Sequence, residues 1–80
     1  MPKLLMIASS GSQDPTRASI PFHIAANGAA AAGMESGVAL AGDATELLKP
    51  EVRDSVRGVG VPPLADLVSA CRDKGVKLYV

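Results

Sequence analysis

An unbroken run of apolar residues at positions 4–8, LLMIA, constrains the fold of this chain more than any other feature. The run is short, is bounded by polar residues and lacks the alternation of a half-exposed strand, so it predicts a central parallel strand covered on both faces. A polar loop at residues 9–14 and a long alanine-rich stretch follow it. Because ligands of open α/β sheets bind beyond the carboxyl ends of the strands, this loop is the first candidate for a functional site.

Length and composition narrow the class of protein further. Eighty residues suffice for one domain, and a hydrophobic content of 48% is too high for a disordered chain. Basic and acidic residues balance at eight each, and Phe22 and Tyr79 are the only aromatic residues, so no nucleic-acid surface is predicted. A single cysteine excludes a disulfide-stapled scaffold, and the apolar stretches are too short for a signal peptide or a membrane span. We therefore expect a cytoplasmic protein with neither a membrane nor a nucleic-acid partner.

The stretch after the loop predicts a helix that starts near Pro15, with Asp14 as its N-cap and a proline in its first turn. Pro21 has no N–H group and therefore predicts a kink or a restart within this helix. Gly33 predicts its end. The face expected on the sheet carries Ile20, Ile24, Gly28 and either Ala31 or Ala32.

Two further apolar runs, at residues 37–41 and 76–80, predict strands that are reached through helices, as parallel pairing and right-handed crossovers require. The helix before the last strand is predicted to begin at Pro62 and Pro63 and to end at Gly75. Its apolar stripe has helical spacing and consists of Leu64, Leu67, Val68 and Cys71.

The second strand is followed by a turn and a short helix in this prediction. Gly42 ends the strand, and Asp43, with Glu46 three residues later, has the form of a capping box. This pattern predicts a helix over residues 44–48, which Pro50 closes.

The loop Ser9-Ser10-Gly11-Ser12 and the turn Gly42-Asp43 both follow predicted strands and belong to the same edge of the sheet. A loop rich in glycine and serine that leads into a helix can present N–H groups and hydroxyls to an anion. This loop lacks both the Gly-Lys-Ser/Thr ending of a phosphate loop and the G-x-G-x-x-G spacing of a dinucleotide site. An anion site and an ordinary solvated turn both remain open as interpretations.

The cysteine, the histidine and the acidic residues do not form a recognisable catalytic or metal-binding set. Cys71 falls on the apolar stripe of its helix, which favours a buried thiol over a nucleophile. His23 has no second histidine and no carboxylate at metal-ligand spacing, which favours a surface or interface residue. We expect no metal and no cofactor. The residues alone predict a small α/β domain and name no activity.

The ordered string of motifs resembles the DsrE/DsrF-like family of small sulfur-relay proteins. The most specific pieces are DPTRA at the start of the first helix, LAGDA at the second turn, and GVPPL followed by GVKLYV. The resemblance covers essentially all 80 residues, but only the N-terminal part of the family domain, which continues for two more strands with their helices. It implies a YchN-like, three-layer α/β/α fold with a mostly parallel sheet. It also implies assembly into homo-oligomers or into hetero-oligomers with other sulfur-relay proteins.

The resemblance implies a function in handling sulfane sulfur, in which a cysteine accepts a persulfide and passes it on. Some relatives are described as predicted peroxiredoxins. The reactive cysteine of the family lies at or just beyond the end of the third strand. The positions of this chain that match the family's pocket, and that we expect to bind a ligand, are Ser10, Gly11, Asp14, Thr16, Arg17, Gly42 and Asp43. No residue of this chain carries over as catalytic.

The sequence departs from the family pattern after the third strand. Tyr79 and Val80 close that strand, the reactive position would come next, and Cys71 does not align with it. The sequence thus indicates a domain truncated there, either at an in-frame UGA codon for selenocysteine or by ordinary truncation. Such a chain is expected to be inactive, and marginally stable or prone to aggregation. The alternative function is a non-catalytic subunit that binds a small anion or builds an oligomer.

Overall fold

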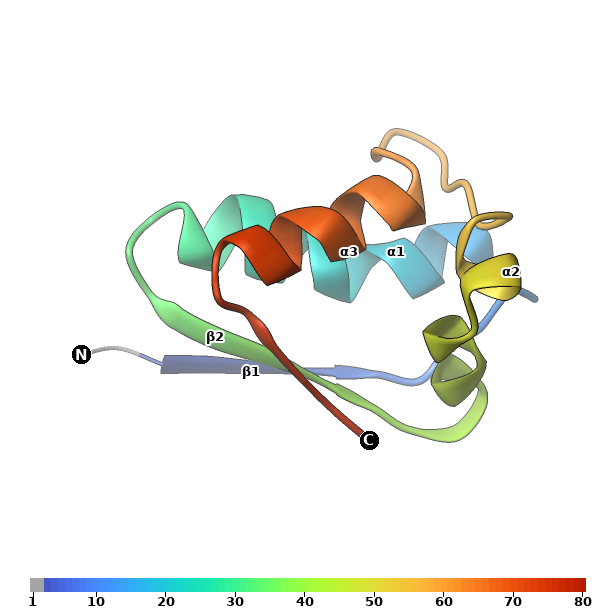
Figure 1. Ribbon diagram of the computed structural model, residues 1–80, viewed down its shortest axis with the longest axis horizontal. Coiled ribbons are helices and arrows are strands. Elements are labelled where there is room, and N and C mark those ends of the chain that lie inside the picture. The colour runs from blue at the N-terminus through green and yellow to red at the C-terminus, as the bar shows by residue number, and fades with distance from the viewer. Residues whose placement is uncertain (1–2) are drawn as a thin grey trace.

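The computed structural model describes residues 3–80 and arranges them as a three-stranded parallel sheet with helices packed on one side (Figure 1). Met1 and Pro2, which the predicted single domain over residues 1–80 includes, lie outside the described residues. The elements in chain order are β1 (Lys3–Ala8), α1 (Pro15–His23), the π-helix η1 (Ile24–Ala30), β2 (Glu35–Leu40), the 3₁₀-helix η2 (Gly42–Leu48), α2 (Pro50–Arg53), α3 (Leu64–Asp73) and β3 (Lys77–Tyr79).

β2 is the central strand of the sheet and pairs in parallel with both β1 and β3. Val38 and Leu40 of this strand are buried in the core. Strand order follows chain order, and the main helices of both connections lie on one face of the sheet, so the two crossovers have the same hand. The predicted α/β class with three parallel strands is confirmed.

Within residues 3–80, β1 is an edge strand, so for the described part of the chain the prediction that it is central and covered on both faces is wrong. Met6 and Ala8 face the core, whereas Leu5 and Ile7 are 58% and 69% exposed on the opposite face. A continuous apolar run indicates that both faces of a strand are hydrophobic. It does not indicate which elements pack on each face, or whether residues 3–80 contain them.

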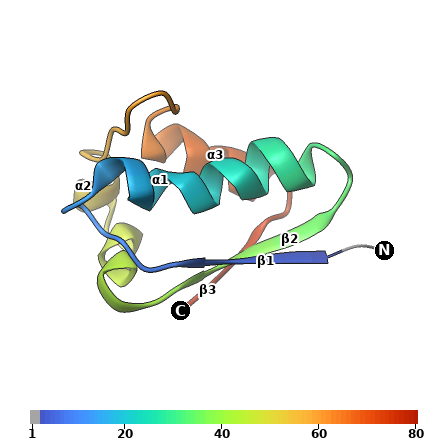
Figure 2. The ribbon, with the colours of Figure 1, turned by 180° about the vertical axis from the view of Figure 1, so that it is seen from behind.

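α1, η1 and α3 form one layer over the sheet, and no element of residues 3–80 covers the other face (Figures 1 and 2). These residues therefore supply the sheet and one of the two helical layers that a three-layer α/β/α fold requires. The core lies between the helices and the sheet and consists of Ala8, Ala18, Phe22, Ala25, Ala26, Val38, Leu40, Ala44, Leu47, Val56, Leu64, Leu67, Cys71 and Val76.

The first helix starts where the sequence predicts, because Asp14 Oδ1 accepts a hydrogen bond from the backbone N–H of Arg17 at 3.2 Å. It runs through Pro21 and changes to π-type hydrogen bonding from Ile24. The predicted restart at Pro21 is therefore not observed, and the change in hydrogen bonding begins three residues later. The predicted end is confirmed by Gly33, which has a φ of 84°.

The face of this helix that packs on the sheet is not the predicted one. The residues expected there, Ile20, Ile24, Gly28, Ala31 and Ala32, are all exposed. The buried residues are Ala18, Ser19, Pro21, Phe22, Ala25, Ala26 and Ala29. Alanine side chains allow the helix to approach the sheet closely, and the larger isoleucines are accommodated on its outer flank.

The segment after β2 also differs from its prediction. The predicted short helix over residues 44–48 is present as part of the 3₁₀-helix Gly42–Leu48, but this helix has no side-chain cap, so the predicted capping box is wrong. The carboxylate of Glu46 bonds to Ser12 instead of returning to the start of its own helix. Pro50 occupies the first turn of α2 rather than closing the preceding helix.

α3 and β3 agree with the sequence in type and in place. Leu64, Leu67 and Cys71 are buried as predicted, and Gly75, with a φ of 76°, ends the helix. β3 covers Lys77–Tyr79 of the predicted 76–80. Among the helices of residues 3–80, none has the length and apolar character needed to cross a membrane.

Candidate functional site

The carboxyl ends of the three strands lie at one edge of the sheet, as their parallel pairing requires. Ile7, Ala39 and Tyr79 stand in one row of the register. Neighbouring strands are about 4.8 Å apart, so β3 ends about 10 Å from the end of β1. The loop after β1 and the start of η2 leave the sheet from adjacent strands.

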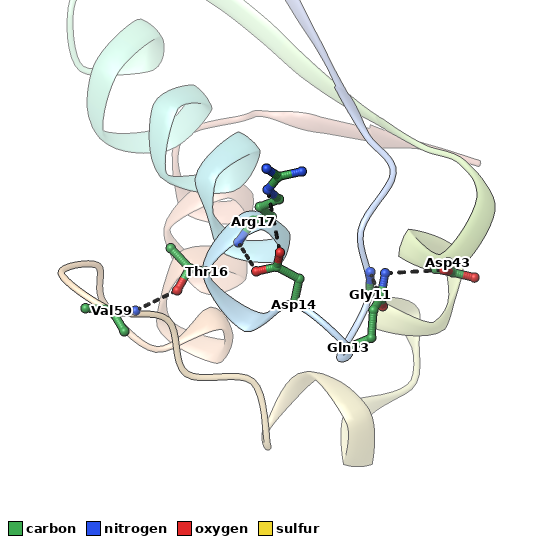
Figure 3. A network of polar contacts seen from close by, with 7 residues as sticks. All are labelled: Gly11, Gln13, Asp14, Thr16, Arg17, Asp43 and Val59. Atoms are coloured by element: carbon green, nitrogen blue, oxygen red, sulfur yellow. Dashed lines mark hydrogen bonds and ion pairs between the residues drawn. The ribbon is translucent and has the colours of Figure 1, made fainter.

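Gln13 links the loop after β1 to the start of η2 (Figure 3). Its Oε1 accepts a hydrogen bond from the backbone N–H of Gly11 at 2.9 Å, and its Nε2 donates to Asp43 Oδ2 at 3.3 Å. The backbone N–H of Asp14 donates to the carbonyl of Gly11 at 3.2 Å. Three predicted site residues, Gly11, Asp14 and Asp43, therefore belong to one connected network.

Glu46 forms a second link between the same two segments. Its Oε1 accepts from the backbone N–H of Ser12 at 2.6 Å and from the Ser12 hydroxyl at 2.7 Å. These bonds hold the pKa of the Glu46 carboxyl below its ordinary value of 4.5, mainly through the backbone donor, and outweigh the opposing effect of desolvation. The carboxylate thus occupies donors that the loop would otherwise offer to an external anion.

Gly11 has to be a glycine for this loop to close on η2. A Cβ atom at this position would collide with the Glu46 side chain and would lie 2.5 Å from the carbonyl oxygen of Asp43. The contact between the two segments therefore depends on the absence of a side chain at Gly11.

The remaining predicted residues of the first loop stand at the start of α1. Asp14 Oδ2 and Arg17 Nε form an ion pair at 3.5 Å, which is largely exposed to solvent. Thr16 is turned away from this pair, and its hydroxyl accepts the backbone N–H of Val59 at 3.0 Å (Figure 3). Thr16 thereby ties the loop before α3 to the helix start and takes no part in the network around Gln13.

An open hollow of about 230 Å³ lies beside the network, between the end of β1 and α1. Its lining consists of Ile7, Ser9, Ser10, Arg17, Ile20 and Pro21. Arg17, which is paired with Asp14, is the charged residue of this lining, Ser9 and Ser10 carry hydroxyl groups, and Ile7, Ile20 and Pro21 are apolar. This combination suits a small anion with an apolar body, such as a thiolate or a persulfide.

The predicted site residues fall into three groups: Gly11, Asp14 and Asp43 in the network, Ser10 and Arg17 in the hollow, and Thr16 and Gly42 at the starts of α1 and η2. Gln13 and Glu46, which make the links, were not predicted as site residues. Ser12 and Glu46 are 34 positions apart, so no local spacing signals their contact. The polar character of the loop was the only available signal for Gln13.

The one thiol of the chain lies away from this edge. Cys71 is buried, its Sγ is 3.7 Å from the carbonyl oxygen of Phe22, and burial raises the pKa of the thiol more than nearby Lys74 lowers it. This environment is that of an unreactive core thiol. His23 Nδ1 lies 3.1 Å from Asn27 Nδ2, and no three His, Cys, Asp or Glu side chains of residues 3–80 are grouped to hold a metal.

Comparisons of the chain with protein-family models, with curated proteins and with solved structures find no match. The geometry of the carboxyl edge and the motifs that resemble a known family are therefore the basis for assigning a function.

Proposed function

We propose that this chain is the N-terminal part of a DsrE-like sulfur-relay protein, which transfers persulfide sulfur or carries out related thiol redox chemistry in the cytoplasm. The reactive cysteine or selenocysteine of this protein follows Val80, and the working form is a homo-oligomer or a hetero-oligomer with other sulfur-relay proteins. The observation that carries the proposal is the hollow with Arg17 at the edge where the three strands end.

A residue that follows Val80 would stand at the same edge as this hollow. Parallel pairing aligns Ile7, Ala39 and Tyr79, so the chain leaves β3 at the level where β1 gives way to Ser9. The distance across the sheet is about two strand spacings, or roughly 10 Å. A persulfide on that residue would extend from the end of β3 along this edge.

Arg17 and the loop hydroxyls supply what sulfur transfer requires from their surroundings. An incoming acceptor thiolate attacks the outer sulfur of the persulfide, a new S–S bond forms, and the old one breaks to release the protein thiolate or selenolate. Negative charge is present throughout this step, and the Arg17 guanidinium stabilises it. Asp14 acts as a positioning residue because its carboxylate holds the Arg17 side chain.

The proposal is tested by expressing the gene with its continuation past codon 80, reading an in-frame UGA as selenocysteine. After treatment with polysulfide, peptide mass spectrometry should find one added sulfur atom on the residue that follows Val80. Arg17→Gln should slow loading about tenfold, as the loss of a charge-assisted interaction predicts. Arg72→Gln, on the exposed surface of α3, is the control and should load normally. Sulfur on Cys71, or no sulfur at all, would refute the proposal.

The hollow also gives physical support to the alternative of a non-catalytic subunit that binds a small anion. In that case thiosulfate should bind the extended protein, with Arg17 resonances shifting in a saturable way, while polysulfide leaves no added sulfur on it. The sulfur-relay proposal predicts added sulfur in the same sample.

A further inference from the structure

The connection between α2 and α3 packs on the first turn of α1. A Cβ atom at Gly58 would lie 3.0 Å from the Cα of Thr16 and 3.4 Å from the carbonyl oxygen of Pro15. One residue further along, the backbone N–H of Val59 donates to the Thr16 hydroxyl at 3.0 Å, across 43 positions of the chain. The first turn of α1 is therefore held by a segment from outside its own helix.

This connection is itself anchored in the core at both ends. The backbone N–H of Leu64 donates to the carbonyl oxygen of Val56 at 3.1 Å, so residues 57–63 form a closed loop. The side chains of Val56 and Leu64 are both buried in the core cluster. Because packing fixes the base of the loop, the contacts made by Gly58 and Val59 fix the start of α1 relative to the core.

Thr16 and Arg17 are neighbours in this turn, but their side chains leave it in different directions. Figure 3 shows the Thr16 side chain directed toward Val59 and away from the side chains of Arg17 and Asp14. Asp14 Oδ1 accepts the backbone N–H of Arg17, and Asp14 Oδ2 pairs with Arg17 Nε. Helix ends fray because their first N–H groups lack intrahelical partners. The position of the guanidinium thus depends on a turn that the Thr16 bond holds from the opposite side.

We infer that Thr16 is a positioning residue for Arg17, and that its bond to Val59 fixes the first turn of α1 and thereby the guanidinium. The inference rests on the proposed function, in which Arg17 stabilises the anions of sulfur transfer. It gives Thr16 a role different from the ligand binding that the family resemblance implies. A shift of a charged group by about 1 Å is enough to slow a reaction that depends on its position.

Variants that separate the Thr16 hydroxyl from the rest of its side chain test the inference. They are made in the protein expressed with its continuation past codon 80, and circular dichroism checks their folding. Thr16→Val keeps the shape of the side chain and removes the hydroxyl, whereas Thr16→Ser keeps the hydroxyl. Ser55→Ala is the matched control, because the exposed Ser55 hydroxyl bonds within its own turn, to the carbonyl oxygen of Val52 at 2.7 Å.

The first readout needs no sulfur donor. In Thr16→Val, the Val59 amide should exchange its hydrogen faster and the NMR signal of the Arg17 Nε–H should shift. Thr16→Ser and Ser55→Ala should match the unmodified protein in both respects. An unchanged Arg17 signal in Thr16→Val would overturn the inference. A shifted Arg17 signal in a protein that polysulfide does not load would support the positioning role and refute sulfur transfer, so the two failures are distinguishable.

The second readout is the rate of loading with polysulfide. Thr16→Val should load about threefold more slowly, as the loss of one neutral hydrogen bond predicts, and Thr16→Ser should load normally. Gly58→Ala keeps the hydroxyl but should slow loading similarly, because its Cβ pushes the loop away from α1. In an Arg17→Gln background, Thr16→Val should cause no further slowing. Equal slowing in both backgrounds, or normal loading by Gly58→Ala, would show that Thr16 does not act by positioning Arg17.

Discussion

Replacing Phe22 by alanine tests which face of the first helix holds the domain together. Phe22 is 1% exposed and belongs to the core, whereas Ile24, two residues further, is 39% exposed. The spacing of apolar residues in the sequence assigned the sheet-packing face to Ile24, and the structure assigns it to Phe22. Phe22→Ala and Ile24→Ala therefore form a matched pair on one helix.

The two substitutions should differ severalfold in how much they lower the free energy of unfolding. Truncating a buried phenylalanine costs about 3–5 kcal/mol, because the transfer free energy of the ring is lost and a cavity remains. A domain of eighty residues has a total stability of about 4–12 kcal/mol. Phe22→Ala should therefore remove a large part of the free energy of unfolding. Ile24→Ala deletes a partly exposed side chain and improves helix propensity, so its cost should be about 1 kcal/mol.

Urea unfolding followed by far-UV circular dichroism measures both costs. The chain has no tryptophan, and Tyr79 is 50% exposed on the sheet, so fluorescence would not report on the core. Equal losses, or a larger loss for Ile24→Ala, would show that the packing of α1 is not as described.

Three further predictions concern the loop network and the thiol. The lowered pKa of Glu46 contributes stability that is present above pH 4.5 and is lost as the pH falls through the folded-state pKa. The NMR signal of the Ser12 amide should therefore titrate below pH 4.5. That titration should vanish in Glu46→Gln, and its persistence would assign it to another group. The Cys71 thiol should react slowly with a thiol reagent in the native protein and rapidly in urea, whereas similar rates would contradict its burial. Gly11→Ala should lower the melting temperature because the added Cβ has no room, whereas Gly28→Ala should stabilise the protein by about 0.5–1 kcal/mol. A higher melting temperature for Gly11→Ala than for Gly28→Ala would contradict both expectations.

The strand and helix types followed from local pattern where one signal dominated. The stripe through Leu64, Leu67 and Cys71 has a single period, and all three residues are buried. The first helix contains two competing stripes, one of alanines with Phe22 and one with the isoleucines. Side-chain size alone favours burial of the isoleucines, whereas close approach of the helix to the sheet favours burial of the alanines. The identity of the buried face depends on this tertiary requirement, which the sequence pattern does not contain.

The candidate site shows the same division between local and long-range information. Asp14 was predicted as a helix cap because the cap and the N–H that it accepts are three residues apart. The contact of Glu46 with Ser12 joins two segments that meet only because β1 and β2 are neighbours. A local interpretation as a capping box was available for Glu46, and it was wrong. The position of β1 at the edge is likewise a property of the assembled sheet.

The measurement that tests the central claim most directly is the mass of the natural protein, captured from its own cells with an antibody against residues 3–80 and mapped by peptide mass spectrometry. The account predicts a chain that continues past Val80, with a cysteine or selenocysteine next in sequence that carries an additional sulfur atom after exposure of the cells to polysulfide. A protein that ends at Val80, or one whose continuation has no sulfur-carrying residue at that position, would contradict it.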